Sequence, residues 1–549
     1  MPTPCPTCSQ PLDADGRCSF CGYTSRRLKR SSLFWLAAVF LILALGVGAY
    51  KYYPSSFLPP LFAKLLTTKD GEVRVAPPVE KVLGTAKPTF SLEELKRFRT
   101  LLRQKDFDTL NDIASRIQAN FERDPVYEYQ VNDFFVCFQT TLAEDEKLFD
   151  EWVKHSPNHF APWLVRARFS YDQGWESRGT EFAHETTVEQ FDNMHVFFIK
   201  CGKDLDVALT LNPRLLNAHI MRLFMANADG DHAEEARLMK QSSALFPTSF
   251  LMYQTMLLAT LPRWGGSYEE MNDIAMRAST HIEANNELSM LFGMIFADQA
   301  WNLRKAKEYD KAIALYSKAI LYGEHYSFFQ ERARTYYFMK DYDNALEDIN
   351  RSIALRPPIV SPYSLRAVIY AATGRIDKAI ADFSLAEELS PGEDDILQHK
   401  RAAANTLILQ GHTAATVNPD QALASYDQAL RIDPFSSEAF FRKGLLYAQS
   451  GQLDQAVPQF RRAIEYDPRD IKAVKAMDYT LMMQGRWDEI IGYWNGFLAL
   501  EPDNGEAYLE RAGTFHHKGD QEKSRADLKQ ACDLGQQKAC SLLQNGGWK

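Results

Sequence analysis

The sequence predicts an all-α protein, in which a solenoid of helix pairs follows a small cysteine-rich head and one helix of membrane-spanning length. Three observations predict this fold class: a pattern that recurs about every 34 residues in the C-terminal half, an uncharged apolar run over residues 31–50, and four cysteines among the first 21 residues. Residues 51–549 form too long a segment for one hydrophobic core, so we expect several structural units.

The four N-terminal cysteines form two Cys-x-x-Cys pairs with nine residues between them. Two such turns can close a tetrahedral all-sulfur site that suits one structural Zn²⁺ ion, because no ligand position stays open for chemistry. The head has almost no apolar core, so the metal would supply its folding energy. Residues 1–25 therefore predict a zinc ribbon, similar to those at the N-terminus of many bacterial membrane proteins. Its ligands would be Cys5, Cys8, Cys18 and Cys21. The alternatives are two disulfides, unrelated cysteines or an iron site.

Residues 31–53 are predicted to form one transmembrane helix, because the uncharged run at residues 31–50 is long enough to cross ~30 Å of hydrocarbon. A cleaved signal peptide is the alternative, but it would discard the ribbon, and the run is longer than a usual signal core. Basic residues crowd the N-terminal flank, so the N-terminus should be cytoplasmic and the C-terminal region periplasmic, if the cell is a Gram-negative bacterium. Residues 54–89 contain several prolines and are typical of a linker.

Charge argues against nucleic acid as a partner. The whole chain carries a net charge of −9, and residues 1–30 hold five basic and two acidic side chains. Residues 51–549 consequently carry a net charge of −12, whereas nucleic-acid binding requires a basic face.

The repeated pattern places a small residue, a large apolar residue and a small residue on the second helix of each predicted pair. Most units end at a proline, and successive units are 33, 34, 43, 34, 34 and 34 residues apart. The first positions of the successive units are Ala312, Ala345, Ala379, Ala422, Ala456, Ile490 and Ser524. The pattern resembles the tetratricopeptide repeat over about residues 292–535, and its best unit is Glu438–Pro468. In such repeats small residues let two helices approach closely and the aromatic residue fills the gap.

We therefore expect tetratricopeptide repeats over residues 291–535, with a capping helix and tail at residues 536–549. The 43-residue interval predicts a longer loop near Gly411–Asn418, and Asp478 occupies the small position of a degenerate unit. Cys532 and Cys540 resemble the disulfide of secreted cysteine-containing helical repeats, since Gly535 could break the helix between them. Two small buried residues are the alternative.

Residues 90–290 are also predicted to be helical but are poorly periodic, and they could be divergent helix pairs. Several phrases, among them Gly174-Trp-Glu-Ser-Arg-Gly179 and Pro262-Arg-Trp-Gly-Gly-Ser267, are similar to a bacterial family of uncharacterised domains, which implies no activity. In the structural interpretation, Ser267 caps a helix and the preceding Trp anchors a turn in the core. In the functional one, four side chains line a ligand pocket. Those four are Trp175, Arg178, Arg263 and Trp264.

No nucleophile elbow, phosphate loop or zinc-protease motif is present in the sequence. Cys137 and Cys201 lie in apolar runs. This is typical of buried thiols or of a mutual disulfide. The repeat resemblance implies a concave, partner-binding face lined by the first helices. It would take an amphipathic or extended segment with apolar anchors, and Lys475 and Arg334 would steer an acidic side chain. The candidate groove residues are Arg334, Phe441, Leu445, Lys475 and Tyr479.

The sequence as a whole favours a non-enzymatic, membrane-anchored protein-interaction scaffold with a periplasmic solenoid. The alternative function is a small-ligand or enzymatic domain at residues 90–290 that uses the Trp/Arg cluster.

Overall fold

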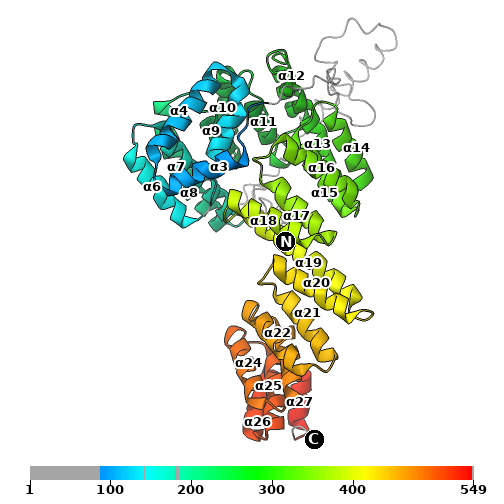
Figure 1. Cartoon of the computed structure of the whole chain (residues 1–549). Helices are drawn as coiled ribbons and strands as arrows, with labels where there is room; N and C mark the ends of the chain where they lie inside the picture. The colour runs from blue at the N-terminus through cyan, green and yellow to red at the C-terminus, as the bar shows by residue number, and fades with distance from the viewer. Residues whose placement is uncertain (1–86, 141, 180–184, 547–549) are drawn as a thin grey trace, which may run out of the picture. The chain divides into compact units, whose positions relative to one another are not determined.

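The computed structural model describes residues 87–140, 142–179 and 185–546, and these residues form helices and turns with no β-strand. The predicted zinc ribbon and transmembrane helix lie outside this range, as does nearly all of the predicted linker. Among the described helices, none is both long and apolar enough to cross a membrane. Figure 1 shows the described chain as successive helices joined by short connections.

Residues 90–290 contain ten α-helices within the described part of the chain and extend into an eleventh. They are α3 (Leu92–Arg103), α4 (Phe107–Arg123), α5 (Glu128–Val136), α6 (Ala143–His155), α7 (Phe160–Arg178), α8 (Val188–Leu211), α9 (Leu216–Ala228), α10 (His232–Leu245), α11 (Phe250–Ala259), α12 (Tyr268–Ser279) and α13 (Met290–Lys305). Three short 3₁₀ turns are η2 (Pro125–Tyr127), η3 (Pro262–Trp264) and η4 (Asn286–Ser289).

The C-terminal helices pair in chain order, as the repeat pattern predicted: each first helix packs against the second helix that follows it. They are α14 (Tyr309–Ile320), α15 (Tyr326–Phe338), α16 (Tyr342–Leu355), α17 (Ser361–Ala372), α18 (Ile376–Leu389), α19 (Asp394–Ala414), α20 (Pro419–Ile432), α21 (Ser437–Gln449), α22 (Leu453–Tyr466), α23 (Ile471–Met482), α24 (Trp487–Leu500), α25 (Gly505–Lys518), α26 (Gln521–Asp533) and α27 (Gln537–Gln544).

The small positions of the pattern are where paired helices touch. Gly444 of α21 faces Phe460 of α22 so closely that a Cβ added at this glycine would lie 2.6 Å from the ring. Ala456 and Ala463, on either side of Phe460 in the pattern, are fully buried. The pattern therefore reports helix–helix contact directly, because only a small side chain admits the neighbouring ring.

An arginine on the first helix of several pairs joins three helices. The guanidinium of Arg366 on α17 donates two hydrogen bonds, of 2.7 and 2.8 Å, to Asp382 of its partner α18. A third, of 2.8 Å, goes to Asn350 of α16 in the preceding pair. Arg511 repeats the arrangement with Asp527 and Asn495, at the same spacing of 16 residues in each direction. This planar, bidentate contact fixes both the pair and its stacking on the pair before it.

The same contact appears in the poorly periodic N-terminal region. Arg166 of α7 donates two hydrogen bonds, of 2.8 and 2.7 Å, to Asp204 of α8 and one of 2.8 Å to Asp150 of α6. Helices α6 to α8 thus follow the packing of the C-terminal pairs. Gly174 serves as the small position, because a Cβ there would lie 2.7 Å from the Phe198 ring.

Two local expectations differ from the structure. The insertion predicted as a loop near residues 411–418 instead lengthens α19, which continues to Ala414, and Gly411 packs against Tyr426. Helix formation satisfies the extra backbone groups without exposing them, which a loop would not do. Lys87, within the predicted linker, has a side chain that is only 9% exposed and takes part in an ion-pair network.

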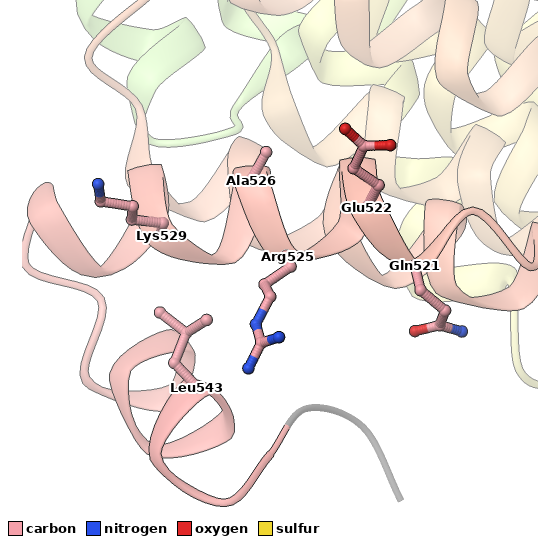
Figure 2. Close-up of a pocket in the computed structure, with 6 residues that line it drawn as sticks. All are labelled: Gln521, Glu522, Arg525, Ala526, Lys529 and Leu543. Atoms are coloured by element: carbon pink, nitrogen blue, oxygen red, sulfur yellow. The ribbon is translucent and has the colours of Figure 1, made fainter.

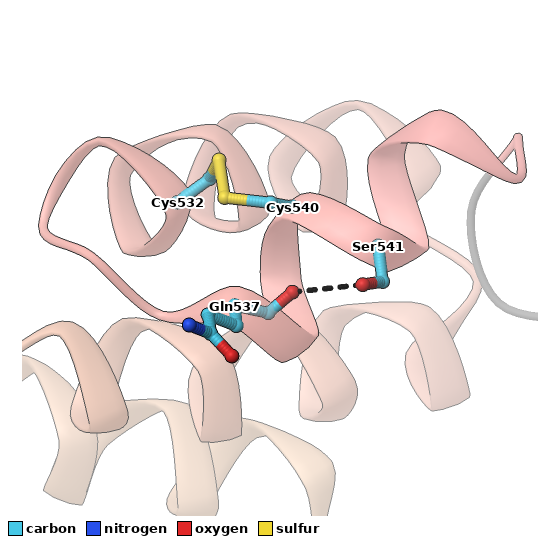
Figure 3. Close-up of a disulfide and its surroundings, with 4 residues drawn as sticks. All are labelled: Cys532, Gln537, Cys540 and Ser541. Carbon is cyan, nitrogen blue, oxygen red and sulfur yellow. Dashed lines mark hydrogen bonds between the residues drawn. A yellow bond between two sulfur atoms is a disulfide. The ribbon is translucent and has the colours of Figure 1, made fainter.

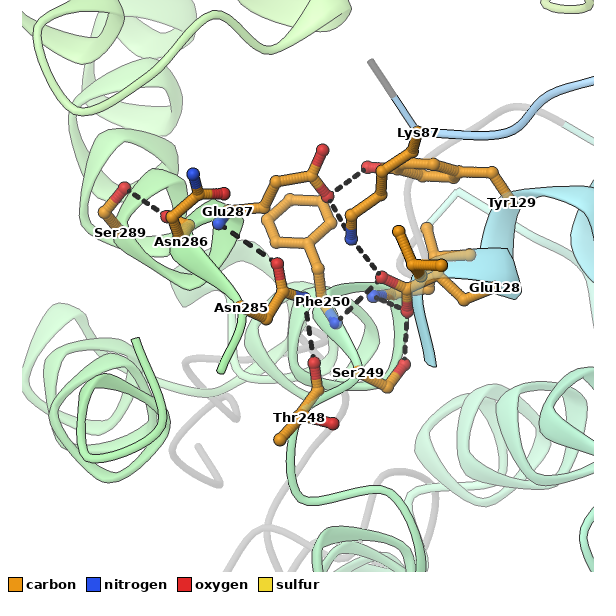
Figure 4. A network of polar contacts seen from close by, with 12 residues as sticks. Lys87, Glu128, Tyr129, Thr248, Ser249, Phe250, Asn285, Asn286, Glu287 and Ser289 are labelled. Atoms are coloured by element: carbon orange, nitrogen blue, oxygen red, sulfur yellow. Dashed lines mark hydrogen bonds and ion pairs between the residues drawn. The ribbon is translucent and has the colours of Figure 1, made fainter. Parts of the chain in front are cut away.

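That network joins the start of the described chain to three elements (Figure 4). The Lys87 ammonium lies 2.9 Å from a carboxylate oxygen of Glu128 on α5 and 2.7 Å from one of Glu287 on η4. The Glu128 carboxylate also accepts hydrogen bonds from Ser249 and from the first backbone amides of α11, so it caps that helix. The buried charges are paired on every side, as burial requires.

Further contacts join the N-terminal helices to the repeats. Arg356, just after α16, forms a buried ion pair with Asp133 of α5, and its guanidinium lies 4.0 Å from the centre of the Tyr129 ring. Arg99 of α3 donates a 2.6 Å hydrogen bond to the backbone oxygen of Leu389, the last residue of α18. Residues 90–290 and the first repeats therefore share an interface.

Candidate functional site

A stripe of exposed side chains follows one face of α23, the first helix of its pair. Lys475, Tyr479 and Met483 are spaced four residues apart, the last of them at the helix C-terminus. This spacing places them one above another along the helix. The Tyr479 side chain is 59% exposed and that of Met483 is 60% exposed. We call these three residues the α23 stripe.

The basic end of the stripe is already paired. The Lys475 ammonium lies 2.7 Å from Glu506 and 3.0 Å from Glu510, both on α25. Hydrogen bonds to Glu506 and then Glu510 raise the pKa of Lys475 above its ordinary value. The expectation that this lysine steers an acidic ligand therefore has to be revised, because two carboxylates already compete for it.

The other predicted groove residues are engaged in packing. Phe441 is only 8% exposed and contacts the Phe460 ring at 6.1 Å between centroids, so it belongs to the core. Leu445 is half-buried against the same core. Arg334 contacts His399 of α19 at 3.2 Å and forms an ion pair with Glu331. Of the five candidates, Tyr479 alone offers a largely exposed apolar surface.

Beside the stripe, Asp478 explains the degenerate repeat. It occupies the position that is small in other pairs, and its carboxylate accepts a 2.6 Å hydrogen bond from the indole of Trp494 on α24. Burial raises the pKa of Asp478 to about 6, although the Trp494 hydrogen bond opposes the shift. The pair replaces the usual small–aromatic contact with a polar one at the same place.

The predicted Trp/Arg cluster is only partly brought together. The Arg178 guanidinium lies 5.8 Å from the ring centres of both Trp175 and Trp264, and burial lowers its pKa. Arg263 instead forms an ion pair with Asp298 of α13, so it does not join the other three residues. Trp264 is 38% exposed, which corrects the expectation that it is anchored in the core. The Arg178 guanidinium thus lies against both indole rings.

Nearby, Ser267 caps α12 as predicted: its hydroxyl accepts a hydrogen bond from the backbone amide of Glu270. The two predicted buried cysteines are free thiols and do not form a mutual disulfide. Burial raises the pKa of both Cys137 and Cys201, which suppresses the reactive thiolate.

At the C-terminus, a disulfide joins Cys532 of α26 to Cys540 of α27, with 4.8 Å between the Cα atoms (Figure 3). Gly535, in the left-handed conformation at φ 90°, reverses the chain between the two helices. An open depression of about 610 Å³ lies between side chains of α26 and α27 (Figure 2). It is lined by Gln521, Glu522, Arg525, Ala526 and Lys529 of α26 and Leu543 of α27.

The predicted zinc ligands, Cys5, Cys8, Cys18 and Cys21, lie outside the described residues. Within the described part of the chain, no group of three or more His, Cys, Asp or Glu side chains is arranged to hold a metal ion. The chemistry of the four-cysteine head therefore rests on its spacing in the sequence.

Comparison with known proteins places tetratricopeptide repeats in the C-terminal half. A family model described as tetratricopeptide repeat matches residues 330–394, 417–471 and 480–539. The TPR repeat-containing protein MJ1428 of Methanocaldococcus jannaschii is 26% identical over 228 residues, which is 40% of this chain and 38% of that protein. Human tetratricopeptide repeat protein 13 is 25% identical over 206 residues, or 36% of this chain and 22% of that protein.

Both alignments thus span well under half of the relative's length. Among solved structures, YrrB, described as a TPR protein with an unusual peptide-binding site, is 20% identical and covers 34% of this chain and 92% of its own, with a TM-score of 0.23. The fold and the matched segments together define the C-terminal half as an all-α solenoid that contains tetratricopeptide repeats, a class that generally mediates protein–protein interaction.

Proposed function

We propose that this protein is a non-enzymatic scaffold that binds a protein partner on the α23 stripe and the neighbouring first helices. The observation that carries the proposal is the exposure of two large apolar side chains, Tyr479 and Met483, on adjacent turns of one helix. An exposed aromatic residue beside a flexible methionine is typical of a surface that gains stability when a partner covers it.

The stripe is well placed for this role because its support is rigid. Ion pairs hold α23 to α25, and the Asp478–Trp494 hydrogen bond holds α23 to α24. A partner would therefore meet a surface that is ordered before binding, which reduces the entropic cost of association. An amphipathic helix or an extended segment with apolar anchors fits such a surface.

A site-specific photo-crosslinker tests the proposal in cells. Introduced in place of Tyr479 or Met483 in the full-length protein, it should capture the same partner segment from both positions. The matched control places it at Leu409, which is 63% exposed on α19 but lies outside the stripe. Capture of the same partners from Leu409, or none from the stripe, would reject the α23 surface as the binding site.

We further propose that the N-terminal region anchors the scaffold in a membrane and carries one structural Zn²⁺ ion. The uncharged run at residues 31–50, its basic N-terminal flank and the doubled Cys-x-x-Cys spacing support this. The ribbon would be cytoplasmic and the solenoid periplasmic. Metal analysis of the purified protein should find one zinc per chain, lost when Cys5 and Cys8 are both replaced by Ser. A reporter enzyme fused after Lys549 should be active outside the cytoplasm and not within it.

A further inference from the structure

The last helix, α27, is short and buries few of its side chains. It has eight residues, and an isolated helix of that length is unstable in water. Ala539 is its one fully buried side chain, while Leu542 and Leu543 are only partly covered. They pack on an apolar surface at the end of the solenoid, formed by Leu509, Ala512, Leu528 and Ala531.

Among the described cysteines, the two in the disulfide are the ones that are not buried in the core. Cys532 and Cys540 are both half-buried, so a small thiol can reach them, whereas Cys137 and Cys201 are fully enclosed in the core. The two enclosed thiols have raised pKa values, so they cannot readily exchange with the disulfide. A change of redox conditions would therefore act on α27 first.

We propose that the Cys532–Cys540 disulfide is a redox-controlled latch that holds α27 over the end of the solenoid. In the oxidised protein, α27 covers the terminal apolar surface, and Leu543 forms one wall of the depression on α26 (Figure 2). In the reduced protein α27 detaches, so the apolar surface becomes exposed and the depression loses that wall. The latch thus couples redox state to the surface available at this end of the protein.

The redox step needs a dithiol reductant. One thiolate of the reductant attacks a latch sulfur and forms a mixed disulfide, which releases the other cysteine as a thiol. The second thiol of the reductant then displaces the remaining cysteine and leaves as the cyclic disulfide. Two electrons and two protons pass to the protein, so two thiols replace one disulfide bond.

The size of the effect follows from the loop that the bond closes. The disulfide spans a sequence separation of eight residues. Chain-entropy reasoning for a loop of this size gives a change on the order of 100-fold in the equilibrium between docked and detached α27. Because α27 fully buries only Ala539, this change should be enough to release it without unfolding the α25–α26 pair, which keeps its own Arg511–Asp527 contact.

Hydrogen exchange of the full-length protein, measured by mass spectrometry with and without dithiothreitol, tests the latch. Reduction should accelerate exchange at least tenfold in residues 537–544 and leave α25 and α26 protected. Reoxidation should reverse the change, and Cys540→Ser should exchange like the reduced protein under both conditions. Continued protection of α27 after reduction would show that packing alone holds the cap. Loss of protection throughout α25 and α26 would show a structural disulfide, and either result would overturn the proposal.

Discussion

The Asp478–Trp494 pair predicts an unusual dependence of stability on pH. Asp478 is mostly buried beneath the α23 stripe, and burial raises its pKa from an ordinary value of 3.8 to about 6. Glu510 reinforces the shift, whereas the Trp494 hydrogen bond and Lys475 oppose it. At neutral pH the folded protein therefore retains an ionised carboxylate in a site that favours the neutral acid.

The sign follows from proton binding. The folded state holds the Asp478 proton more tightly than the unfolded chain does, so acidification favours folding at this site. The free energy of unfolding begins to rise as the pH falls through about 6, and the rise is complete below about 4, where Asp478 is protonated in both states. A shift of about two pKa units corresponds to about 3 kcal/mol of folding free energy, which the protein lacks at pH 7 and above.

Asp478→Asn removes the titration and keeps an oxygen that accepts the Trp494 hydrogen bond. At pH 7.5 we expect the variant to be more stable than the natural protein by about 2–3 kcal/mol, and this advantage should shrink to about 1 kcal/mol at pH 4.5. Urea unfolding of both proteins between pH 4.5 and 8 measures the difference. Other buried acids such as Asp133 are present in both proteins and cancel. A stability difference that does not change with pH would refute the reasoning.

Three further tests, two of them with a matched control substitution, probe the packing. Gly444→Ala should cost about 1–3 kcal/mol, because the added Cβ would meet the Phe460 ring. Gly492→Ala, at a helical glycine with open space around it, should instead stabilise the protein by up to about 1 kcal/mol. Thermal unfolding distinguishes the two outcomes. Lys87→Met should cost about 3 kcal/mol because it leaves the Glu128 and Glu287 carboxylates without their cation. Lys96→Met, which breaks a more exposed pair, should cost much less; equal losses would contradict the network. Arg366→Lys should cost about 1–2 kcal/mol, since a lysine cannot bridge three helices, and urea unfolding should show it.

The sequence predicted the helix pairs because each pair is a local unit whose contacts recur at a fixed spacing. The small position at Gly444 and its aromatic partner Phe460 lie 16 residues apart and could be read directly. The arginine contacts share that spacing, so a search for Arg and Asp 16 residues apart would have found Arg366 and Arg511. Their role as connectors between pairs was missed because they vary among the repeats.

The long-range contacts could not be read in the same way. Arg356 and Asp133 are 223 residues apart, and no local pattern marks them as partners. The sequence also did not predict which of the candidate groove residues are exposed. Repeat position suggested both Phe441 and Tyr479 as contact residues, yet one packs into the core and the other is exposed. Which side chain turns inward depends on the neighbouring helix, here on the Phe460 ring beside Phe441.

The affinity of the full-length protein for the captured partner segment, measured by calorimetry, tests the central claim most directly. If the α23 stripe is the binding surface, Tyr479→Ala with Met483→Ala should weaken binding by about 30-fold or more, since central apolar anchors of an interface can carry about 1–2 kcal/mol each. Leu409→Ala should leave the affinity within about twofold of the natural value, because a residue outside the interface contributes little. Equal affinity of the double variant and the natural protein would contradict the account.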